Sequence, residues 1–327
     1  MKIASWNVLA APWALPVHYP KQLDPALLTR DARCDRTVAR MVGLDEVADV
    51  WCLQEATGPE LAKMHGALDR AADALAAQEF GHAPNGDQLS VAEVWDPEIW
   101  DPEIYGVPDS DICGSEQAYA RMHAQNGREY WAHWLGDDVA WEANGPAVIV
   151  RRDAFDDLVL RELYLGGFGN AAAMMQAIHY ETDTRVRCVS VHLDADHHAV
   201  RMNELQSLLA QLDDASDNWR NALTIVAGDF NCDTQDGEIA ELLANAGYVD
   251  AHASCGQFDP THPYARPGDT YAPLARIDHI MVRGAPVTRA IVDDVGVWEI
   301  AEPGDRLIEH LRRTGTDHLQ ISATFRM

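Results

Sequence analysis

The stretch from residue 223 to 233 most strongly constrains the fold of this 327-residue chain. Residues 223–227 form a largely apolar, β-branched run, which is typical of a strand covered on both faces. Gly228 then lets the backbone bend, and Asp229 and Asn231 point to the same side if the backbone stays extended. A carboxylate beside a carboxamide suits a site that handles a phosphate and a water molecule. The alternative is an ordinary Asp/Asn turn after a core strand.

The composition of the chain limits the number of domains, the chance of membrane spans and the cellular compartment. Hydrophobic residues make up 47% of the chain, which is enough for the core of one large domain or two small ones. No apolar run is long enough to span a bilayer, and the N-terminal residues resemble a strand rather than a signal peptide. The six cysteines show no paired spacing, which favours a reduced compartment without structural zinc. We therefore expect a soluble, cytoplasmic protein.

The formal net charge of -27 limits the partners that the chain can bind. A strongly negative surface repels polyanions and lacks the phosphate-neutralising contacts of non-specific nucleic-acid binding. Lysine occurs only three times, whereas arginine is frequent, and either a salt-adapted source or a GC-rich genome would produce this bias. We expect no binding of long duplex nucleic acid.

Strand and helix patterns alternate along the chain, and no Ser/Gly-rich linker divides it. Several predicted strands end in polar residues, and ligands of α/β folds gather at strand ends. These residues are Asn7, Glu55, His192, Asp229, Asn231, Asp278, Asp317 and His318. A carboxylate within an apolar strand, as at Asp278, needs a partner.

Residues 82–145 are expected to be an irregular, aromatic-rich insertion. The five-residue sequence WDPEI occurs at 95–99 and again at 100–104, and its prolines block a regular helix or a central strand. A long irregular insertion is often a lid or a binding loop. A surface excursion packed by its own aromatic side chains is the alternative.

Six motifs in order resemble the endonuclease/exonuclease/phosphatase superfamily. They are SWNVLA (5–10), CLQE (52–55), VHL (191–193), GDFN (228–231), RIDH (276–279) and TDH (316–318). In finer detail, WNVLA and a His-Leu pair followed by Arg201 are similar to the deadenylase and nocturnin branch. His279 stands where a tyrosine is common, and residues 82–145 match no family pattern.

The resemblance implies an α/β fold, a four-layer α/β/β/α sandwich of two packed mixed sheets with outer helices. Residues 1–327 would form a single domain of this type. It also implies hydrolysis of phosphoesters with a divalent metal, Mg²⁺ or Mn²⁺. Glu55 is a hard oxygen donor suited to these ions, Asn7 would hold that carboxylate or touch the phosphate, and Asp317 would bind metal directly or through water.

The remaining candidates would act on the substrate and the attacking water. Asp229 would orient and deprotonate the water, and Asn231 would donate to a phosphate oxygen. His318 would stabilise phosphoryl charge or carry a proton, and Asp278 would accept from its ring N–H and fix its orientation. His192 is a second imidazole that faces the phosphate or the leaving group.

Three hypotheses follow for the function. The first is a nuclease or phosphodiesterase that acts on short single-stranded nucleic acid or on nucleotides and dinucleotides. The second is a small-molecule or lipid phosphatase or phosphodiesterase that uses the same site. The third, a non-catalytic binding protein, is weakened because every expected catalytic residue is present. No membrane partner is expected, and the sequence leaves the oligomeric state open.

Overall fold

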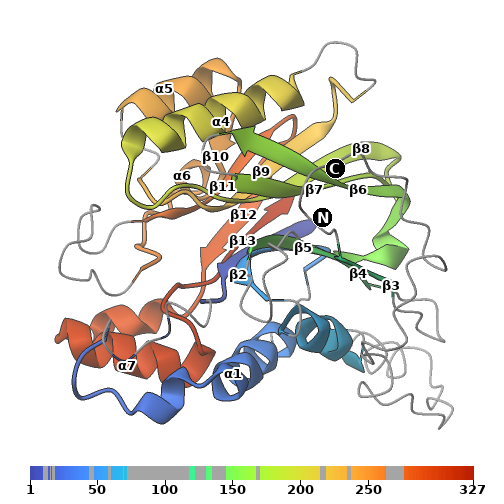
Figure 1. Ribbon diagram of the computed structural model, residues 1–327. Helices are drawn as coiled ribbons and strands as arrows, with labels where there is room; N and C mark the ends of the chain where they lie inside the picture. Colours follow the sequence, from blue (N-terminus) through green and yellow to red (C-terminus); the bar gives the residue numbers. More distant parts are fainter. Residues whose placement is uncertain are drawn as a thin grey trace, which may run out of the picture.

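A computed structural model describes residues 1–9, 14, 16, 19–43, 48–57, 60–68, 70–71, 118–121, 130–134, 145–166, 170–213, 219–233, 237–262 and 276–327. Two mixed β-sheets pack face to face between outer helices, which confirms the predicted α/β sandwich (Figure 1). No helix in the described part of the chain is long and apolar enough to cross a membrane.

One sheet is built from strands near the two ends of the chain, and the other from strands in its middle. One sheet has the order β12 (Val287–Val292), β13 (Ile321–Phe325), β1 (Lys2–Asn7), β2 (Val50–Ala56), β5 (Gly145–Arg151), β4 (Tyr130–Trp134) and β3 (Ala118–Arg121). The other has the order β10 (Val249–Asp250), β11 (Asp278–Arg283), β9 (Leu223–Asp229), β8 (Thr184–His192), β7 (Asn170–His179) and β6 (Phe155–Gly166).

The inner faces of the two sheets enclose the central core. Apolar side chains from both sheets meet there, including Ile3, Val50 and Val148 from one and Met175, Ile225 and Ile280 from the other. A polar link crosses this core, because Gln54 Nε2 donates to Ser190 Oγ at 3.0 Å and that hydroxyl donates to the Leu53 carbonyl at 2.8 Å. Burying polar groups is tolerated here because each of these contacts provides a hydrogen-bond partner.

Helices cover the two outer faces (Figure 1). Helix α1 (Arg30–Val42) packs Cys34 and Met41 against Trp6 and Trp51 of β1 and β2, and α7 (Pro303–Thr314) lies beside α1. On the other side, α4 (His198–Leu212) and α5 (Gly237–Asn245) pack against β8 and β9 in a separate apolar cluster. The sheets are therefore buried on both faces, as the apolar run at 223–227 predicts.

Strand direction brings the polar strand ends together. Strands β1 and β2 are parallel, and so are β8 and β9, so the carboxyl ends of each pair meet at one edge. Strand β11 runs antiparallel to β9 with Asp278 paired to Asp229, so its first residue lies at the same edge. Residues 317–318 precede β13, which is antiparallel to β1, and they reach that edge as well.

The structure differs from the sequence predictions in several places. Strands β3 and β4 occupy part of the 82–145 insertion, which was expected to be irregular throughout, because β4 pairs with the long apolar edge of β5. The short β10 and α6 (Ala251–Ser254) were not predicted. The duplicated segment 95–104 and the strand predicted at 269–272 lie outside the described residues.

A buried ionic cluster ties β10 and α6 to β11. Asp250 accepts from Arg276 Nη2 at 2.7 Å, lies 3.2 Å from His279 Nδ1, and caps α6 through two backbone N–H groups. Burial acts to raise the pKa of Asp250, but His279, Arg276 and a backbone hydrogen bond outweigh it and hold that pKa well below its usual range. The carboxylate is therefore charged in the folded protein.

We expect Asp250→Asn to lower the free energy of unfolding at pH 7 by about 3 kcal/mol, because it leaves a buried arginine without its counter-ion. A carboxyl group with a lowered folded pKa stabilises the fold above its unfolded pKa of about 3.9, and this contribution is lost as the pH falls further. Denaturant unfolding of both proteins from pH 7 to pH 3 should show the difference shrinking below about pH 4. Glu238→Gln, at an exposed ion pair, should change stability by less than about 0.5 kcal/mol. A difference that stays constant with pH would contradict this role.

Candidate active site

Asn7 joins the two sheets at the edge where the polar strand ends meet. Its Nδ2 donates to Glu55 Oε1 at 3.0 Å and to Asp229 Oδ2 at 3.1 Å, while its Oδ1 accepts from the backbone N–H of Leu9. Both amide hydrogens are thus used to hold two carboxylates in place. The predicted contact between Asn7 and the Glu55 carboxylate is present, and Asp229 shares it.

Two imidazoles face the Asp229 carboxylate. His192 Nε2 lies 3.7 Å from Asp229 Oδ2 and 4.0 Å from Glu55 Oε1, and the His192 side chain is 26% exposed. His318 Nε2 lies 3.7 Å from the same Asp229 oxygen. Asp229 is therefore the common neighbour of both imidazoles, and its role as general base remains a prediction.

Asp278 and His318 make the contact that the sequence analysis predicts. His318 Nδ1 lies 2.9 Å from Asp278 Oδ2, and both side chains are buried. Burial lowers the pKa of His318, but the charge and hydrogen bond of Asp278, with Asp229 and Asp317, outweigh it and raise that pKa to about 10. At neutral pH the side chain is an imidazolium whose Nε2–H points toward Asp229. The catalytic roles of the pair remain predictions.

The backbone of His318 is fixed by three contacts. Its carbonyl accepts from Trp6 Nε1 and lies 2.9 Å from His310 Nε2, and its N–H donates to Thr316 Oγ1. Thr316 Oγ1 in turn donates to the carbonyl of Asn7 at 2.7 Å. The imidazole is thus anchored to β1 and α7, and its position is set by the fold rather than by a mobile loop.

Two site residues have left-handed backbone conformations. Glu55 has φ 58° and Asn231 has φ 51°, and non-glycine residues in this region often occur at functional sites. Strand β9 ends at Asp229, so the extended backbone expected through Asn231 is wrong. Asn231 instead donates its backbone N–H to Asp229 Oδ1 at 2.8 Å and its Nδ2 to the Leu193 carbonyl at 2.9 Å. Only its second amide hydrogen remains for the predicted phosphate contact.

The neighbouring strand leaves no room for a side chain at Gly228. A Cβ at this position would lie 1.9 Å from the carbonyl oxygen of Val191, and the residue has φ 155°. The close approach at Gly228 is therefore that of the neighbouring strand β8. Glycine here lets β8 and β9 carry His192 and Asp229 to paired positions.

Asp317 lies next to Tyr19 and His262, which the sequence did not indicate as site residues. Tyr19 donates its hydroxyl to Asp317 Oδ2 at 3.1 Å, and His262 Nε2 lies 3.9 Å from the same oxygen. The rings of His262 and His318 pack edge to face with centroids 4.8 Å apart. Neither Tyr19 nor His262 lies on a strand, so no periodic pattern indicated them. Metal binding by Asp317 remains a prediction.

The buried carboxylates fit a divalent cation. Asp278 Oδ1 is buried and has no hydrogen-bond partner among the described residues, although its charge calls for one. The described residues contain two groups of three possible ligands within 4.8 Å of one another, namely Asp229, Asp278 and His318, and His262, Asp317 and His318. Glu55 belongs to neither group, and its binding of a metal remains a prediction.

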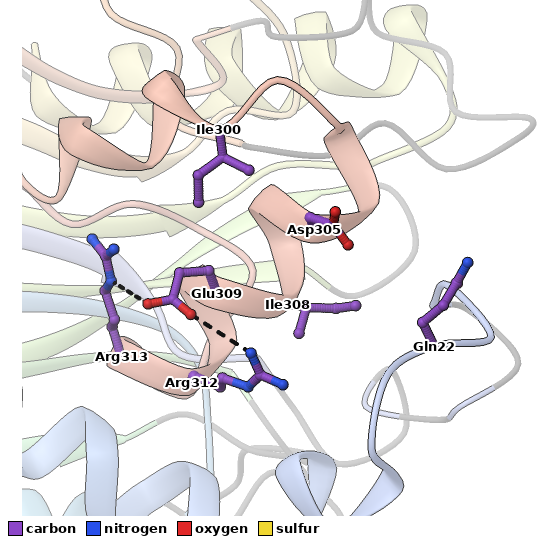
Figure 2. Close-up of a pocket in the computed structure, with 7 residues that line it drawn as sticks. All are labelled: Gln22, Ile300, Asp305, Ile308, Glu309, Arg312 and Arg313. Carbon is purple, nitrogen blue, oxygen red and sulfur yellow. Dashed lines mark hydrogen bonds and ion pairs between the residues drawn. The ribbon is translucent and has the colours of Figure 1, made fainter.

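A pocket of about 470 Å³ lies elsewhere, over α7 (Figure 2). Figure 2 shows Glu309 between two arginines of the same helix, Arg312 and Arg313, with which it forms ion pairs of 3.7 and 3.0 Å. None of the eight candidate residues lines this pocket. Arg313 also pairs with Asp294 outside the helix, and the pocket is separate from the site described above.

Solved structures with the same fold include two phosphatases and the catalytic domain of nocturnin. One is ANGEL2, a 2′,3′-cyclic phosphatase in complex with adenosine-2′,3′-vanadate. The alignment covers 100% of this chain and 95% of ANGEL2, at 12% identity and a TM-score of 0.61. The alignment with the human nocturnin catalytic domain with bound sulfate covers 100% of this chain and 94% of that domain, at 16% identity and a TM-score of 0.56. The alignment with a mannosyl-6-phosphatase from Bacteroides thetaiotaomicron covers 100% of both chains, at 14% identity and a TM-score of 0.56. At these identities the likeness shows the fold.

Sequence comparison gives the family directly. No curated protein matches the chain. The profile of the Endonuclease/Exonuclease/phosphatase family matches residues 4–318, which include all eight candidate residues. The chain therefore belongs to the endonuclease/exonuclease/phosphatase family and is a hydrolase of phosphoester bonds.

Proposed function

We propose that the chain is a divalent-metal-dependent phosphodiesterase or nuclease that acts as a single domain on short single-stranded nucleic acid or on nucleotides and dinucleotides. The observation that carries the proposal is the convergence of two carboxylates and two imidazoles around Asn7, where the strands of both sheets end. In motif detail the chain resembles the deadenylase and nocturnin branch of its family.

Asp229 takes the proton of the attacking water in this proposal. It is held by Asn7 on one oxygen and by the Asn231 backbone on the other, so both oxygens have fixed directions. His318 and His192 lie 3.7 Å away and donate to the phosphoryl oxygens and the leaving group. Asp278 acts through His318 by keeping its Nε2–H turned toward the site.

Enzymes of this family generally depend on a divalent metal, and the carboxylates described above supply the oxygen ligands that Mg²⁺ and Mn²⁺ prefer. Glu55 would hold such an ion, with Asn7 fixing the direction of its carboxylate. When bound, the ion neutralises charge on the phosphate oxygens during attack.

A substrate panel tests the proposal. Purified protein with Mg²⁺ would be assayed against short RNA and DNA, dinucleotides, a 2′,3′-cyclic nucleotide, mannose 6-phosphate and phospholipid headgroups. Asp229→Asn serves as the control that ties any hydrolysis to this site. The proposal expects the nucleotidyl diesters to be the best substrates. A phosphomonoester or lipid headgroup as the best substrate would instead support the second hypothesis.

Substrate length gives a separate prediction. Duplex binding requires many Lys/Arg contacts to phosphates, and the chain carries a net charge of -27. Bases can instead stack on aromatic side chains, each contributing about 1–3 kcal/mol. We expect dinucleotides and short single strands to have a higher kcat/KM than plasmid duplex DNA, and deletion of 95–104 to raise KM more than it lowers kcat. Plasmid DNA as the best substrate, or a deletion without effect on either constant, would contradict this preference.

A further inference from the structure

A buried histidine–aspartate pair contacts the backbone of His318. His310 lies on α7, and Asp294 directly precedes the short 3₁₀-helix η4 (Val295–Glu299). His310 Nδ1 lies 2.8 Å from Asp294 Oδ2, and its Nε2 lies 2.9 Å from the carbonyl oxygen of His318. The His310 side chain is fully buried. The pair therefore connects the outer helix α7 to a residue of the candidate site.

Both ring nitrogens of His310 face oxygen acceptors. Carboxylate and carbonyl oxygens have no hydrogen to give, so both nitrogens donate and the ring is an imidazolium. The two distances are those of charge-assisted hydrogen bonds, about 2.7–2.9 Å. Burial acts to raise the pKa of Asp294, but the hydrogen bonds and charges of His310 and Arg313 outweigh it and lower that pKa. Asp294 is therefore the buried counter-ion of His310.

We propose that Asp294 and His310 are positioning residues for His318, and that the hydrogen bond from His310 Nε2 to the His318 carbonyl keeps the catalytic imidazole aligned with Asp229. The inference rests on the proposed function, in which His318 acts on the phosphate from 3.7 Å beside Asp229. It goes further because neither Asp294 nor His310 belongs to the six sequence motifs.

The peptide groups of His318 depend on contacts of this kind. His318 lies three residues before β13 and outside its ladder of hydrogen bonds with β1. Its carbonyl accepts from Trp6 Nε1 and from His310 Nε2, both at 2.9 Å, and its N–H donates to Thr316 Oγ1 at 3.3 Å. Hydrogen bonds with a charged donor are roughly twice as strong as neutral ones. The contact from α7 is therefore the strongest of the three.

Two substitutions at position 310 separate its two hydrogen bonds. In His310→Gln the amide nitrogen takes the place of Nε2 and still donates to the His318 carbonyl. In His310→Asn it takes the place of Nδ1 and reaches only Asp294. A displacement of about 1 Å at a reacting group can cost about 100-fold in rate. We expect His310→Asn to lower kcat by about 10–100-fold with KM nearly unchanged, and His310→Gln to stay within about 3-fold of the wild-type kcat.

His252→Asn is the matched control. His252 is also buried, and its Nε2 donates at 3.1 Å to the carbonyl of Ile291 on the edge strand β12. Ile291 is not a candidate site residue. Removal of this donor should lower the melting temperature, as His310→Asn also should, but should leave kcat unchanged. A purely structural role of His310 would produce this same pattern in His310→Asn.

A second readout does not depend on turnover. With histidines labelled at the Cε1 position, the ring signal of His318 would be identified in NMR spectra by its absence from His318→Asn. We expect this signal to shift in His310→Asn and to keep its position in His310→Gln and His252→Asn. The signal thus reports the position of the His318 ring even if no substrate is hydrolysed.

The inference is overturned if His310→Asn keeps the wild-type kcat, if it leaves the His318 signal unshifted, or if His310→Gln loses as much kcat as His310→Asn. The absence of hydrolysis of any phosphoester by the wild type, with the expected NMR shifts present, would instead overturn the proposed function alone. Circular dichroism would establish that each variant is folded. Should His310→Asn not fold, Asp294→Asn replaces it, because asparagine keeps the side-chain volume and tolerates the left-handed backbone at φ 57°. It must lower kcat by about 10-fold with KM unchanged.

Discussion

Asp229→Asn should reduce kcat by about 10²–10⁴-fold, the range that general acid–base catalysis contributes. Asp229 Oδ2 accepts from Asn7 and faces two imidazoles, while Oδ1 accepts from the backbone N–H of Asn231. Whichever way the carboxamide of Asn is turned, its NH₂ group faces one of these two N–H donors. The variant therefore loses the proton acceptor and one of the two hydrogen bonds that orient it.

The measurement is kcat with saturating Mg²⁺ on the best substrate of the panel. Asp156→Asn is the matched control, since Asp156 is exposed on the edge strand β6. We expect the control to keep wild-type kcat. Because Asp229→Asn removes one of several converging negative charges, its melting temperature should stay close to that of the wild type. An Asp229→Asn enzyme with wild-type kcat would exclude Asp229 as the base.

Asp278→Asn should lower kcat by about 100-fold or more and leave KM nearly unchanged. Asp278 is buried and reaches the site only through His318, at 2.9 Å from Nδ1. Without its charge, both the orientation of the imidazole and the support for its positive form are weakened. Asp278 is thus expected to be a positioning residue, and its loss affects the transition state more than substrate binding.

Asp250→Asn separates this effect from a general loss of structure. Asp250 is also a buried carboxylate paired with a histidine on β11, but it stabilises α6 and Arg276. We expect Asp250→Asn to unfold more easily while the folded fraction keeps its kcat. Asp278→Asn should instead keep its stability and lose kcat. Equal kcat values for wild type and Asp278→Asn would mean that Asp278 is only a structural carboxylate.

Much of the site could be predicted because it lies at strand ends. Asn7, Glu55, His192 and Asp229 each end or nearly end a strand, and parallel pairing within each sheet brings such ends together. Electrostatics predicts that a buried carboxylate such as Asp278 needs a partner. The resemblance to the family then indicated His318 as that partner.

Other features depend on chain geometry that periodicity does not encode. His262 lies in a segment between two prolines, at positions 260 and 263, and Tyr19 lies in a loop, so neither has a strand pattern to place it. Asn231 leaves the strand because its backbone N–H bonds to the Asp229 side chain instead of continuing the ladder. The role of Gly228 became clear only from the position of Val191 on the adjacent strand.

Metal dependence of hydrolysis tests the central claim most directly, namely that carboxylates at this edge support phosphoester hydrolysis with a divalent cation. Initial rates on a dinucleotide would be measured after EDTA treatment and during titration with Mg²⁺ or Mn²⁺, for the wild type and for Glu55→Gln. We predict no hydrolysis in EDTA, full recovery with either ion, and a much higher ion requirement for Glu55→Gln. Full activity in the chelator, or a Glu55→Gln titration identical to that of the wild type, would contradict the account.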